Sequence, residues 1–333
     1  MCVDNAGLPQ YAVRTPSGHL SATLTRSAMP RCTPLAAARR PARHPLRRAL
    51  PAAVALLLGV TGASPLRAQS AGNASPPPVP RAPVTESPAA RACVDATGTG
   101  VAGATLIADA RTGALVAGYA ERVDRPLIPA STFKIISALV ALETGVIAEA
   151  QTVIPWDSVT RDRPEINRDL DLQTAFRLSA VPHFQSLVRR IGPARMQHAL
   201  DTIGYGNRDI SGGIDQFWLT GALRISPREQ VALLTRLLHD DLPVSRRSMA
   251  MVRAMMLNEA TAAYTIRAKT GLATPPGSET VGWWVGWVEH GAAVHVFATV
   301  LETAAPTASF NAQRLSVTRC ALQALSILPV APQ

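Results

Sequence analysis

The sequence contains very little lysine. Of its 33 basic side chains only Lys134 and Lys269 are lysines, and the others are all arginines. Such a preference is typical of a GC-rich genome, so the two exceptions indicate positions at which arginine cannot serve. A guanidinium group stays protonated at any workable pH, whereas an amine that is removed from water can lose its proton and act as a base or a nucleophile. We therefore expect chemistry at an uncharged amine.

The usual metal-binding patterns are missing as well. The four cysteines and seven histidines of the chain include neither a CxxC nor an HExxH pattern. These spacings would be needed for the common zinc sites. We therefore expect neither a metal ion nor any other tightly bound cofactor.

An excess of basic charge is lacking outside the N-terminal segment. The formal net charge is +10, but residues 1–68 hold nine arginines and one acidic residue. The remainder has 24 basic and 22 acidic side chains, a net charge of only +2. A nucleic-acid-binding protein would gather basic residues on a folded face. We expect no nucleic-acid partner.

Residues 1–68 are predicted to be an N-terminal extension and a secretory signal peptide. Arginines between positions 39 and 48 precede an apolar run at 49–60, and Ala63 or Ala68 offers a small residue for cleavage. Met29 is a candidate start of translation. The run is short for a membrane span, and no cysteine follows it to carry a lipid. We expect secretion to the periplasm with no membrane anchor after cleavage; a retained N-terminal anchor is the alternative.

The segment at 69–90 is rich in Ser, Ala, Gly and Pro and predicts a disordered spacer. Cys2 and Cys32 fall in the part that cleavage removes, which leaves Cys93 and Cys320, one near each end of the mature chain. In an oxidising compartment these two are candidates for a disulfide if the ends pack together. The sequence leaves that pairing open.

The folded part is expected to have strands near both ends. Two short apolar runs, 103–109 and 114–119, flank a turn that contains Gly113 and predict a β-hairpin. Near the other end the sequence predicts strands at 266–270, 281–288 and 293–300, followed by a last helix at about 309–328.

The middle of the chain predicts helices. From Pro129 to Gly145 a proline precedes a largely apolar run and a glycine ends it, which indicates a buried helix. Residues 146–262 show helical periodicity broken by polar loops, and Ser226 to Glu229 form a capping box with proline at the first helical position. Strands at both ends around a helical middle indicate an α+β fold, with one antiparallel sheet built from distant segments and a helical insertion.

Ser131-Thr132-Phe133-Lys134 places a hydroxyl and an amine three residues apart, on one face of a helix. A serine hydroxyl is a weak nucleophile until a base removes its proton, and a neutral lysine can be that base. The first helical turn also directs unpaired N–H groups toward charge that develops on an acylated carbonyl. Taken alone, the pattern also fits a solvated helix start, but its apolar flanks favour a lysine with a depressed pKa.

Two further motifs make the pattern specific. Lys269-Thr270-Gly271 follows late in the chain, and Ser179-Ala180-Val181 lies between. In this order the motifs resemble those of the class D, oxacillinase-type serine β-lactamases of the penicillin-recognising serine enzyme superfamily. The likeness extends from about 93 to 325 and includes four more stretches, Tyr205-Gly206-Asn207, Asp209 to Asp215, Phe217-Trp218-Leu219 and Trp283 to Glu289.

The resemblance implies a β-lactamase/transpeptidase-like fold, an antiparallel sheet flanked by N- and C-terminal helices with an inserted all-helical region. The catalytic domain would cover 91–330, with its sheet part at about 91–130 and 263–330 and its helical part at about 131–262. Its implied function is hydrolysis of the β-lactam ring of penicillin-type antibiotics, which confers resistance. We expect small-molecule β-lactam substrates and a monomer or homodimer.

The resemblance also implies roles for five catalytic residues. Ser131 resembles the acylated nucleophile, and Lys134 resembles the lysine that carbon dioxide or bicarbonate converts to N6-carboxylysine, the general base of acylation and deacylation. Trp218 resembles the indole that donates a hydrogen bond to this carbamate. Ser179 resembles the hydroxyl that passes a proton to the departing ring nitrogen, with Lys269 setting its electrostatic field.

The remaining site residues are implied to hold the substrate and keep the site dry. Backbone N–H groups of Ser131 and Leu272 would form the oxyanion hole, and Arg314 would hold the substrate's carboxylate as a bidentate fork. The other implied contacts are Val181 and Leu219, as apolar walls, and Thr270 and Gly271. The Trp283-Trp284 pair is expected to pack the sheet, and Tyr205 and Asn207 to shape the site. The loop at 272–278 and the rim at 156–172 leave the substrate spectrum open.

Two other functions share part of the motif set. A penicillin-binding transpeptidase or carboxypeptidase would act on peptidoglycan, but such enzymes usually carry SxN where this chain has Ser179-Ala180-Val181. A β-lactam sensor domain would be acylated and stay so, but such receptors sit behind several membrane helices. Turnover of a β-lactam separates both alternatives from a hydrolase.

Overall fold

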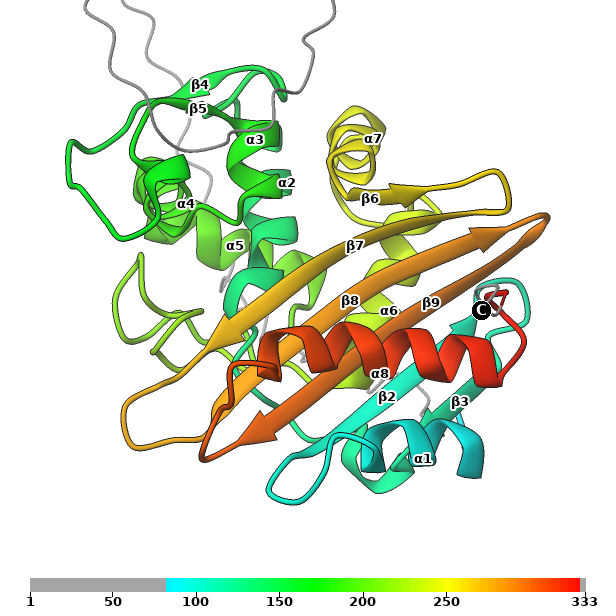
Figure 1. Cartoon of the computed structure of the whole chain (residues 1–333). Coiled ribbons are helices and arrows are strands. Elements are labelled where there is room, and N and C mark those ends of the chain that lie inside the picture. Colours follow the sequence, from blue (N-terminus) through cyan, green and yellow to red (C-terminus); the bar gives the residue numbers. More distant parts are fainter. Residues whose placement is uncertain (1–81, 330–333) are drawn as a thin grey trace, which may run out of the picture. The chain divides into compact units, whose positions relative to one another are not determined.

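The computed structural model describes residues 82–329, and the predicted signal peptide and most of the predicted spacer lie outside this range. All described residues belong to a single unit of the chain. They form a seven-stranded sheet in the order β1-β3-β2-β9-β8-β7-β6 and a separate two-stranded sheet, β4-β5 (Figure 1). Every neighbouring pair is antiparallel except β1 and β3, which run parallel. The α+β prediction is therefore confirmed.

The strands of the large sheet come from both ends of the described chain. They are β1 (Val84–Glu86), β2 (Ala102–Asp109), β3 (Leu115–Gly118), β6 (Leu257–Ala260), β7 (Tyr264–Ala273), β8 (Thr280–His290) and β9 (Ala293–Thr303). The small sheet consists of β4 (Val153–Ile154) and β5 (Leu170–Asp171). The predicted hairpin and the three late strands are thus present, and β7 to β9 form a continuous antiparallel meander.

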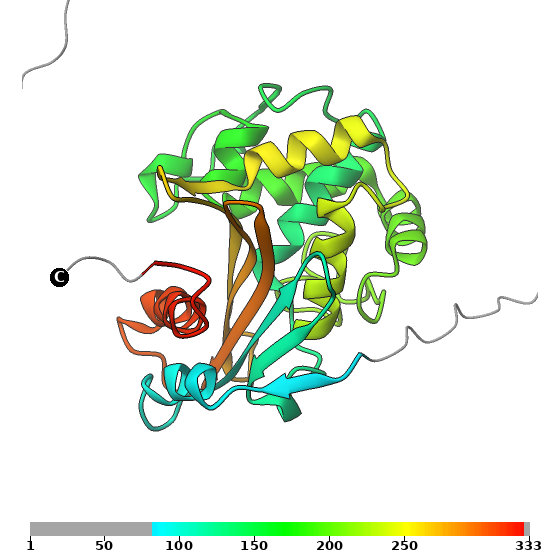
Figure 2. The same ribbon diagram turned by 90° about the vertical axis from the view of Figure 1, so that its right-hand side faces the viewer.

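Helices cover both faces of the large sheet. On one face lie α1 (Pro88–Asp95) and α8 (Phe310–Ala324), whereas the helical region lies on the other (Figure 2). That region contains α2 (Lys134–Glu143), α3 (Leu172–Arg177), α4 (Val181–Ile191), α5 (Pro193–Ile203), α6 (Pro227–Leu238) and α7 (Arg246–Met255). Short 3-10 turns are η1 (Ala120–Arg122), η2 (Ala130–Phe133) and η3 (Pro164–Ile166).

Because both faces are covered, the central strands are apolar almost throughout, and β8 is buried from Thr280 to Val288. Successive side chains of a strand point to opposite faces. Trp283 and Trp287 accordingly pack in the core toward the helical region, and Trp284 packs in the core under α8. Trp283 also donates a 2.8 Å hydrogen bond to the carbonyl of Ile128. The prediction that the tryptophan pair packs the sheet is confirmed.

Local sequence explains where the helices begin. Ser226 accepts a hydrogen bond from the N–H of Glu229, whose carboxylate accepts from the N–H of Ser226, so the predicted capping box opens α6. The predicted buried helix begins as the 3-10 turn η2 and continues as α2. Gly145 follows α2 with a φ of +68°, a left-handed conformation that glycine adopts without strain.

Several predicted boundaries are wrong. The predicted spacer at 69–90 is ordered over 82–90, where β1 pairs with β3 and α1 begins after its cap Ser87. The sheet also extends beyond the predicted limits, since β1 and β6 lie outside 91–130 and 263–330. The middle of the chain is not all helical, because β4, β5 and β6 lie in it. The last helix ends at Ala324, four residues early, and a turn follows.

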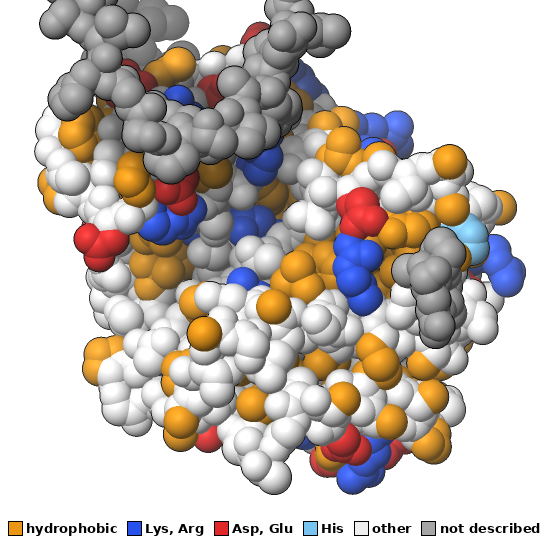
Figure 3. Space-filling view, in the orientation of Figure 1, with side chains coloured by type: hydrophobic (Ala, Val, Ile, Leu, Met, Phe, Trp, Pro, Cys, Tyr) orange, Lys and Arg blue, Asp and Glu red, His pale blue; other side chains and the backbone are white. Residues whose placement is uncertain are grey.

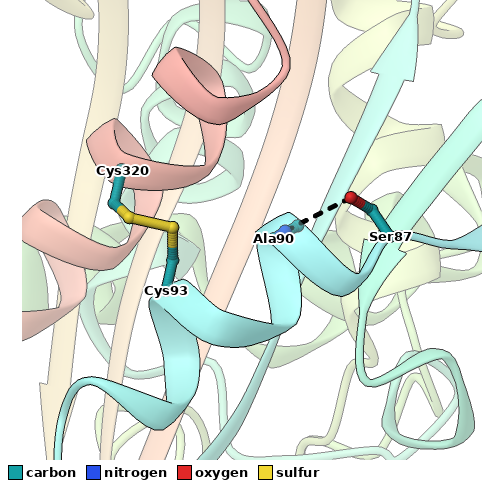
Figure 4. Close-up of a disulfide and its surroundings, with 4 residues drawn as sticks. All are labelled: Ser87, Ala90, Cys93 and Cys320. Atoms are coloured by element: carbon teal, nitrogen blue, oxygen red, sulfur yellow. Dashed lines mark hydrogen bonds between the residues drawn. A yellow bond between two sulfur atoms is a disulfide. The ribbon is translucent and has the colours of Figure 1, made fainter.

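A disulfide joins α1 to α8. Cys93 and Cys320 are bonded through their sulfur atoms, and their Cα atoms lie 5.7 Å apart (Figure 4). Close by, Ser87 caps α1 by accepting a hydrogen bond from the N–H of Ala90 (Figure 4). The possible pairing that the sequence left open is therefore present, on the sheet face opposite the helical region.

Two further findings concern residues 82–329 only. In this range no helix is long and apolar enough to cross a membrane. The same residues bring together no group of three or more His, Cys, Asp or Glu side chains that could hold a metal ion.

We expect the disulfide to stabilise the domain without affecting its chemistry. The disulfide closes a loop of 227 residues. Loss of a native disulfide typically lowers the free energy of unfolding by about 3 kcal/mol. The melting temperature of the Cys93→Ser/Cys320→Ser variant should therefore fall by about 6–12 °C. Calorimetry of the purified domain tests this, with the wild type in reductant as the matched control. An unchanged melting temperature in both samples would show that the crosslink contributes nothing.

Candidate active site

The site is organised around the turn that carries Ser131. Ala130, directly before it, has a φ of +50°, a strained conformation for a residue other than glycine. Ser131 Oγ and Lys134 Nζ are joined by a 2.8 Å hydrogen bond. Ser131 is 7% exposed and Lys134 is fully buried. The predicted serine-lysine pair is therefore assembled at the start of α2, on its buried side.

Lys134 lies in surroundings that disfavour its charged form. Burial holds the pKa of its amine well below the ordinary lysine value, and the positive charges of Lys269 and Arg163 lower the pKa further. The aromatic ring of Phe184, with its centroid 5.4 Å from Nζ, forms part of the wall. Burial therefore favours the neutral amine, the form that can accept a proton.

Trp218 contributes a buried hydrogen-bond donor. Its side chain is 1% exposed, and its Nε1–H has no partner within the described part of the chain. The indole stacks on the ring of Phe133, the residue before Lys134, with centroids 5.5 Å apart. A buried donor without a partner is costly. Because the indole can only donate, it suits an acceptor atom, and an anion best.

Ser179 and Lys269 form a second hydroxyl-amine pair. Ser179 lies between α3 and α4 with a φ of +54°, and it accepts a 3.0 Å hydrogen bond from Lys269 Nζ. The same Nζ donates to the carbonyl of Thr270 at 2.9 Å. Burial lowers the pKa of Lys269 to about 7, with further contributions from Arg314 and Arg163. The charge on Lys269 is therefore present below about pH 7 and is progressively lost above it.

Strand β7 lies directly against the turn that carries Ser131. A Cβ atom at Gly271 would lie 3.0 Å from the carbonyl oxygen of Pro129 and 3.1 Å from Thr132 Cγ2. This close approach explains why the position is glycine. The next residue, Leu272, is 40% exposed, so the strand brings its backbone to the edge of the turn.

Arg314 reaches the same strand from α8. Its Nη1 donates a 2.5 Å hydrogen bond to the carbonyl of Gly271, and its Nε is buried with no partner among the described residues. Burial lowers its pKa to about 10, so the guanidinium remains charged at neutral pH. The structure thus brings Arg314, Lys269 and the serine-lysine pair to one place, although they come from distant segments.

The other predicted site residues lie around these groups and contribute packing to the site. Val181 and Leu219 are only partly buried. Phe184, whose ring lies beside Lys134 Nζ, and Phe133, on which Trp218 stacks, were missed as part of the site. Tyr205 is buried against the ring of Phe133, and burial raises its pKa, so it stays neutral.

Two residues from the predicted outer features also have clear structural contacts. Asn207 donates to the carbonyl of Ala222 and accepts from the N–H of Arg224, which ties two loop segments together. Arg163, in the predicted rim at 156–172, donates to the carbonyl of Leu178, next to Ser179. No motif marks Arg163, because its influence depends on a contact between residues 15 apart.

Basic side chains dominate the site. The charged groups that shift the pKa values of Lys134 and Lys269 are all cations, and they include Arg163 in both cases. The space-filling view shows a hollow beside the helical region around α3 and α4, with Lys or Arg side chains along its wall (Figure 3). Such a surface favours an anionic small molecule.

Comparison with known proteins gives a consistent picture. The family model described as the penicillin binding protein transpeptidase domain matches residues 103–321. The β-lactamase OXA-48 of Klebsiella pneumoniae is 44% identical over 209 residues, which are 63% of this chain and 78% of the relative. The β-lactamase OXA-5 of Pseudomonas aeruginosa is 42% identical over 60% of this chain and 75% of that protein.

Solved structures agree with these relatives. The class D β-lactamase YbXI from Nostoc superposes with a TM-score of 0.66 at 39% identity, covering 69% of this chain and 95% of that one. FUS-1 (OXA-85), a class D β-lactamase from Fusobacterium nucleatum subsp. polymorphum, gives a TM-score of 0.68 at 28% identity, covering 72% and 98%.

The two pKa values can be measured directly because the chain has only two lysines. In a sample labelled with carbon-13 at lysine Cε and kept free of carbon dioxide, we expect Lys269 to titrate near pH 7 and Lys134 to titrate well below the ordinary lysine pKa. Lys269→Arg assigns the two resonances. Arg314→Gln should raise the pKa of Lys269 but not that of Lys134, since Arg314 acts on Lys269 alone. An ordinary pKa for Lys269 would contradict the role of burial.

Proposed function

The chain belongs to the penicillin-binding transpeptidase domain family and is a serine β-lactamase of class D, and we propose that it hydrolyses β-lactams through an acyl-enzyme on Ser131 with carboxylated Lys134 as general base. The observation that carries the proposal is the 2.8 Å contact between Ser131 Oγ and the buried Lys134 Nζ. A buried, neutral amine next to a hydroxyl is the arrangement that nucleophilic catalysis needs.

In acylation, Lys134 in its carboxylated form would take the proton of Ser131 while Oγ attacks the carbonyl carbon of the ring. The developing oxyanion would accept hydrogen bonds from the backbone N–H groups of Ser131 and Leu272. The close packing of Gly271 on the turn supports this assignment, because it brings the N–H of the following residue beside the nucleophile. Breaking the ring C–N bond then requires a proton for the nitrogen.

Ser179 is suited to deliver that proton. Its Oγ accepts a hydrogen bond from Lys269, so the hydroxyl hydrogen is free to point toward the departing nitrogen. Lys269 keeps the hydroxyl oriented, and its charge favours the anionic substrate. Arg314 and Thr270 would hold the substrate's carboxylate. The buried Nε of Arg314, which has no partner among the described residues, supports this role because a buried guanidinium nitrogen needs a hydrogen-bond acceptor.

Deacylation needs a base that takes a proton from water, because Ser131 is esterified in the acyl-enzyme. Carbon dioxide reacts only with an unprotonated amine, which the burial of Lys134 supplies. The resulting N6-carboxylate would supply a base that activates water for hydrolysis of the ester. Two observations support the modification, namely the lowered pKa of the buried amine and the unpaired Nε1–H of Trp218, whose indole stacks on Phe133, the residue before Lys134.

The same proposal includes secretion to the periplasm and resistance to penicillin-type antibiotics. The disulfide supports export, because such bonds persist in oxidising compartments. The disulfide lies within the proposed catalytic domain at 91–330, and the preceding segment at 1–68 is proposed to be removed.

Turnover of nitrocefin by the mature protein is the deciding experiment. We expect hydrolysis that falls after decarboxylation at low pH and returns when bicarbonate is added. Lys134→Ala should lose at least about 1,000-fold in kcat, because both steps lose their base. Acylation of the protein by one equivalent of β-lactam without turnover would contradict hydrolysis and favour a sensor domain. Activity on peptidoglycan peptides alone would favour a transpeptidase or carboxypeptidase. Bicarbonate-independent hydrolysis would rule out the carbamate.

Trp218→Phe isolates the role of the indole donor. Phenylalanine keeps the aromatic stacking on Phe133 but removes Nε1–H, so the carbamate loses a hydrogen bond of about 1.5–3 kcal/mol, or roughly tenfold to a hundredfold in bicarbonate affinity. Carbon-13 bicarbonate gives an NMR signal from the carbamate, and its titration measures that affinity. Trp284→Phe is the matched control, because its buried Nε1–H also lacks a partner among the described residues but lies under α8. Equal affinity in Trp218→Phe and the wild type would contradict the assignment.

A further inference from the structure

The rim at 156–172 is a well-supported segment beside the site. Strands β4 and β5 pair at its base, and the backbone N–H of Trp156 donates to Asp169. Asn167 bonds both the N–H and the carbonyl of Arg161, which closes the loop on itself. The backbone of this segment is therefore held in place by its own hydrogen bonds and by the β4-β5 pair.

Arg163 extends from this rim toward the site. Its Nη2 donates a 2.9 Å hydrogen bond to the carbonyl of Leu178, the residue before Ser179. Its Nε donates to Glu165 at 2.8 Å. Neither contact uses Nη1, and 48% of the side chain remains exposed to solvent. The guanidinium thus borders the Ser179 side of the site and keeps donors available.

The charge of Arg163 reaches both reacting amines. It lowers the pKa of Lys134 and also that of Lys269, whereas Arg314 acts on Lys269 alone. Arg314 is 8% exposed and bonded to the β7 backbone, in place for the carboxylate on the substrate's ring system. Arg163 comes from a different element and has no such assignment. Besides Lys269, the site therefore carries two separate guanidinium groups, one from α8 and one from the rim.

We propose that Arg163 is a specificity-determining residue that binds a second anionic group, a carboxylate or sulfonate on the acyl side chain of the substrate. The inference rests on the proposed function and names its favoured substrate class, the dianionic β-lactams. The second anionic group of the substrate binds the exposed edge of the Arg163 guanidinium. The carbonyl of Leu178 holds the opposite edge of the same guanidinium in place. An arginine held on one side by a backbone carbonyl is pre-organised for such a contact.

The ion pair with Glu165 modulates this site and does not block it. Glu165 is 44% exposed, and pairs of this kind exchange partners at little cost because water screens both charges. Neutralising Glu165 should therefore free the guanidinium and strengthen the preference for a dianion. Neutralising Arg163 should do the opposite.

Benzylpenicillin and carbenicillin provide a matched test, because they differ only by one carboxylate on the side chain. The measured quantity is kcat/KM for carbenicillin divided by kcat/KM for benzylpenicillin. We expect Arg163→Gln to lower this ratio about fivefold, the size of one partly exposed charge pair. Arg163→Lys should keep most of the ratio, and Glu165→Gln should raise it about twofold.

Arg161→Gln is the control for net charge. Arg161 lies two residues before Arg163 in the same rim and is held by Asp157 and by the carbonyl of Val159. Its substitution changes the charge of the protein equally and should leave the ratio unchanged. Raising the salt concentration from about 50 to about 500 mM should lower the ratio in the wild type and in Arg161→Gln but not in Arg163→Gln.

The outcomes separate this inference from the proposed function. If Arg163→Gln turns over benzylpenicillin and keeps the wild-type ratio, the second anion site is wrong while the hydrolase remains. An equal fall for both substrates would show that Arg163 only supports the Leu178 segment, which also overturns the inference. If the wild type turns over neither penicillin, the proposed function itself is wrong.

Discussion

The burial of an amine without a counter-charge is the constraint on which the site depends. Lys134 is fully enclosed, and the charged groups that act on it are cations. Removing an ammonium ion from water is costly, so burial shifts the equilibrium of the amine toward its neutral form. The surrounding features serve this state. The ring of Phe184 lies against the amine and keeps water away, and the start of α2 holds the amine within reach of the serine.

The sheet supplies the second half of the site and fixes it in place. Strand β7 is bonded along its whole length to β8, and the register pairs Lys269 with Val285 and Gly271 with Trp283. The tryptophans of β8 anchor this register on both faces, and Trp283 is bonded to the segment that leads into the Ser131 turn. The distance between the two lysine-hydroxyl pairs is therefore set by a packed core and does not depend on a mobile loop.

Local signals in the sequence predicted much of this arrangement. Pro129, Gly145 and the Ser226 capping box marked helix boundaries, because caps and stops act within a few residues. The motifs around Ser131, Ser179 and Lys269 identified the residues that the fold brings together. What escaped prediction depends on contacts between distant segments. Strand β1 has only three residues and no apolar alternation, so its sequence does not predict a strand. Arg163 acts on the site only because the rim folds back onto Leu178.

The bond between Cys93 and Cys320 also affects how the domain resists a pulling force. It joins the first helix of the described chain to the last, so nearly all of the domain lies inside one covalent ring. A pull applied to the chain outside this ring, as during passage through a narrow pore or capture by a processive protease, is carried by the crosslink. The strands between the two cysteines and the catalytic turn then bear little of the load, and unravelling from either end stops at α1 or α8.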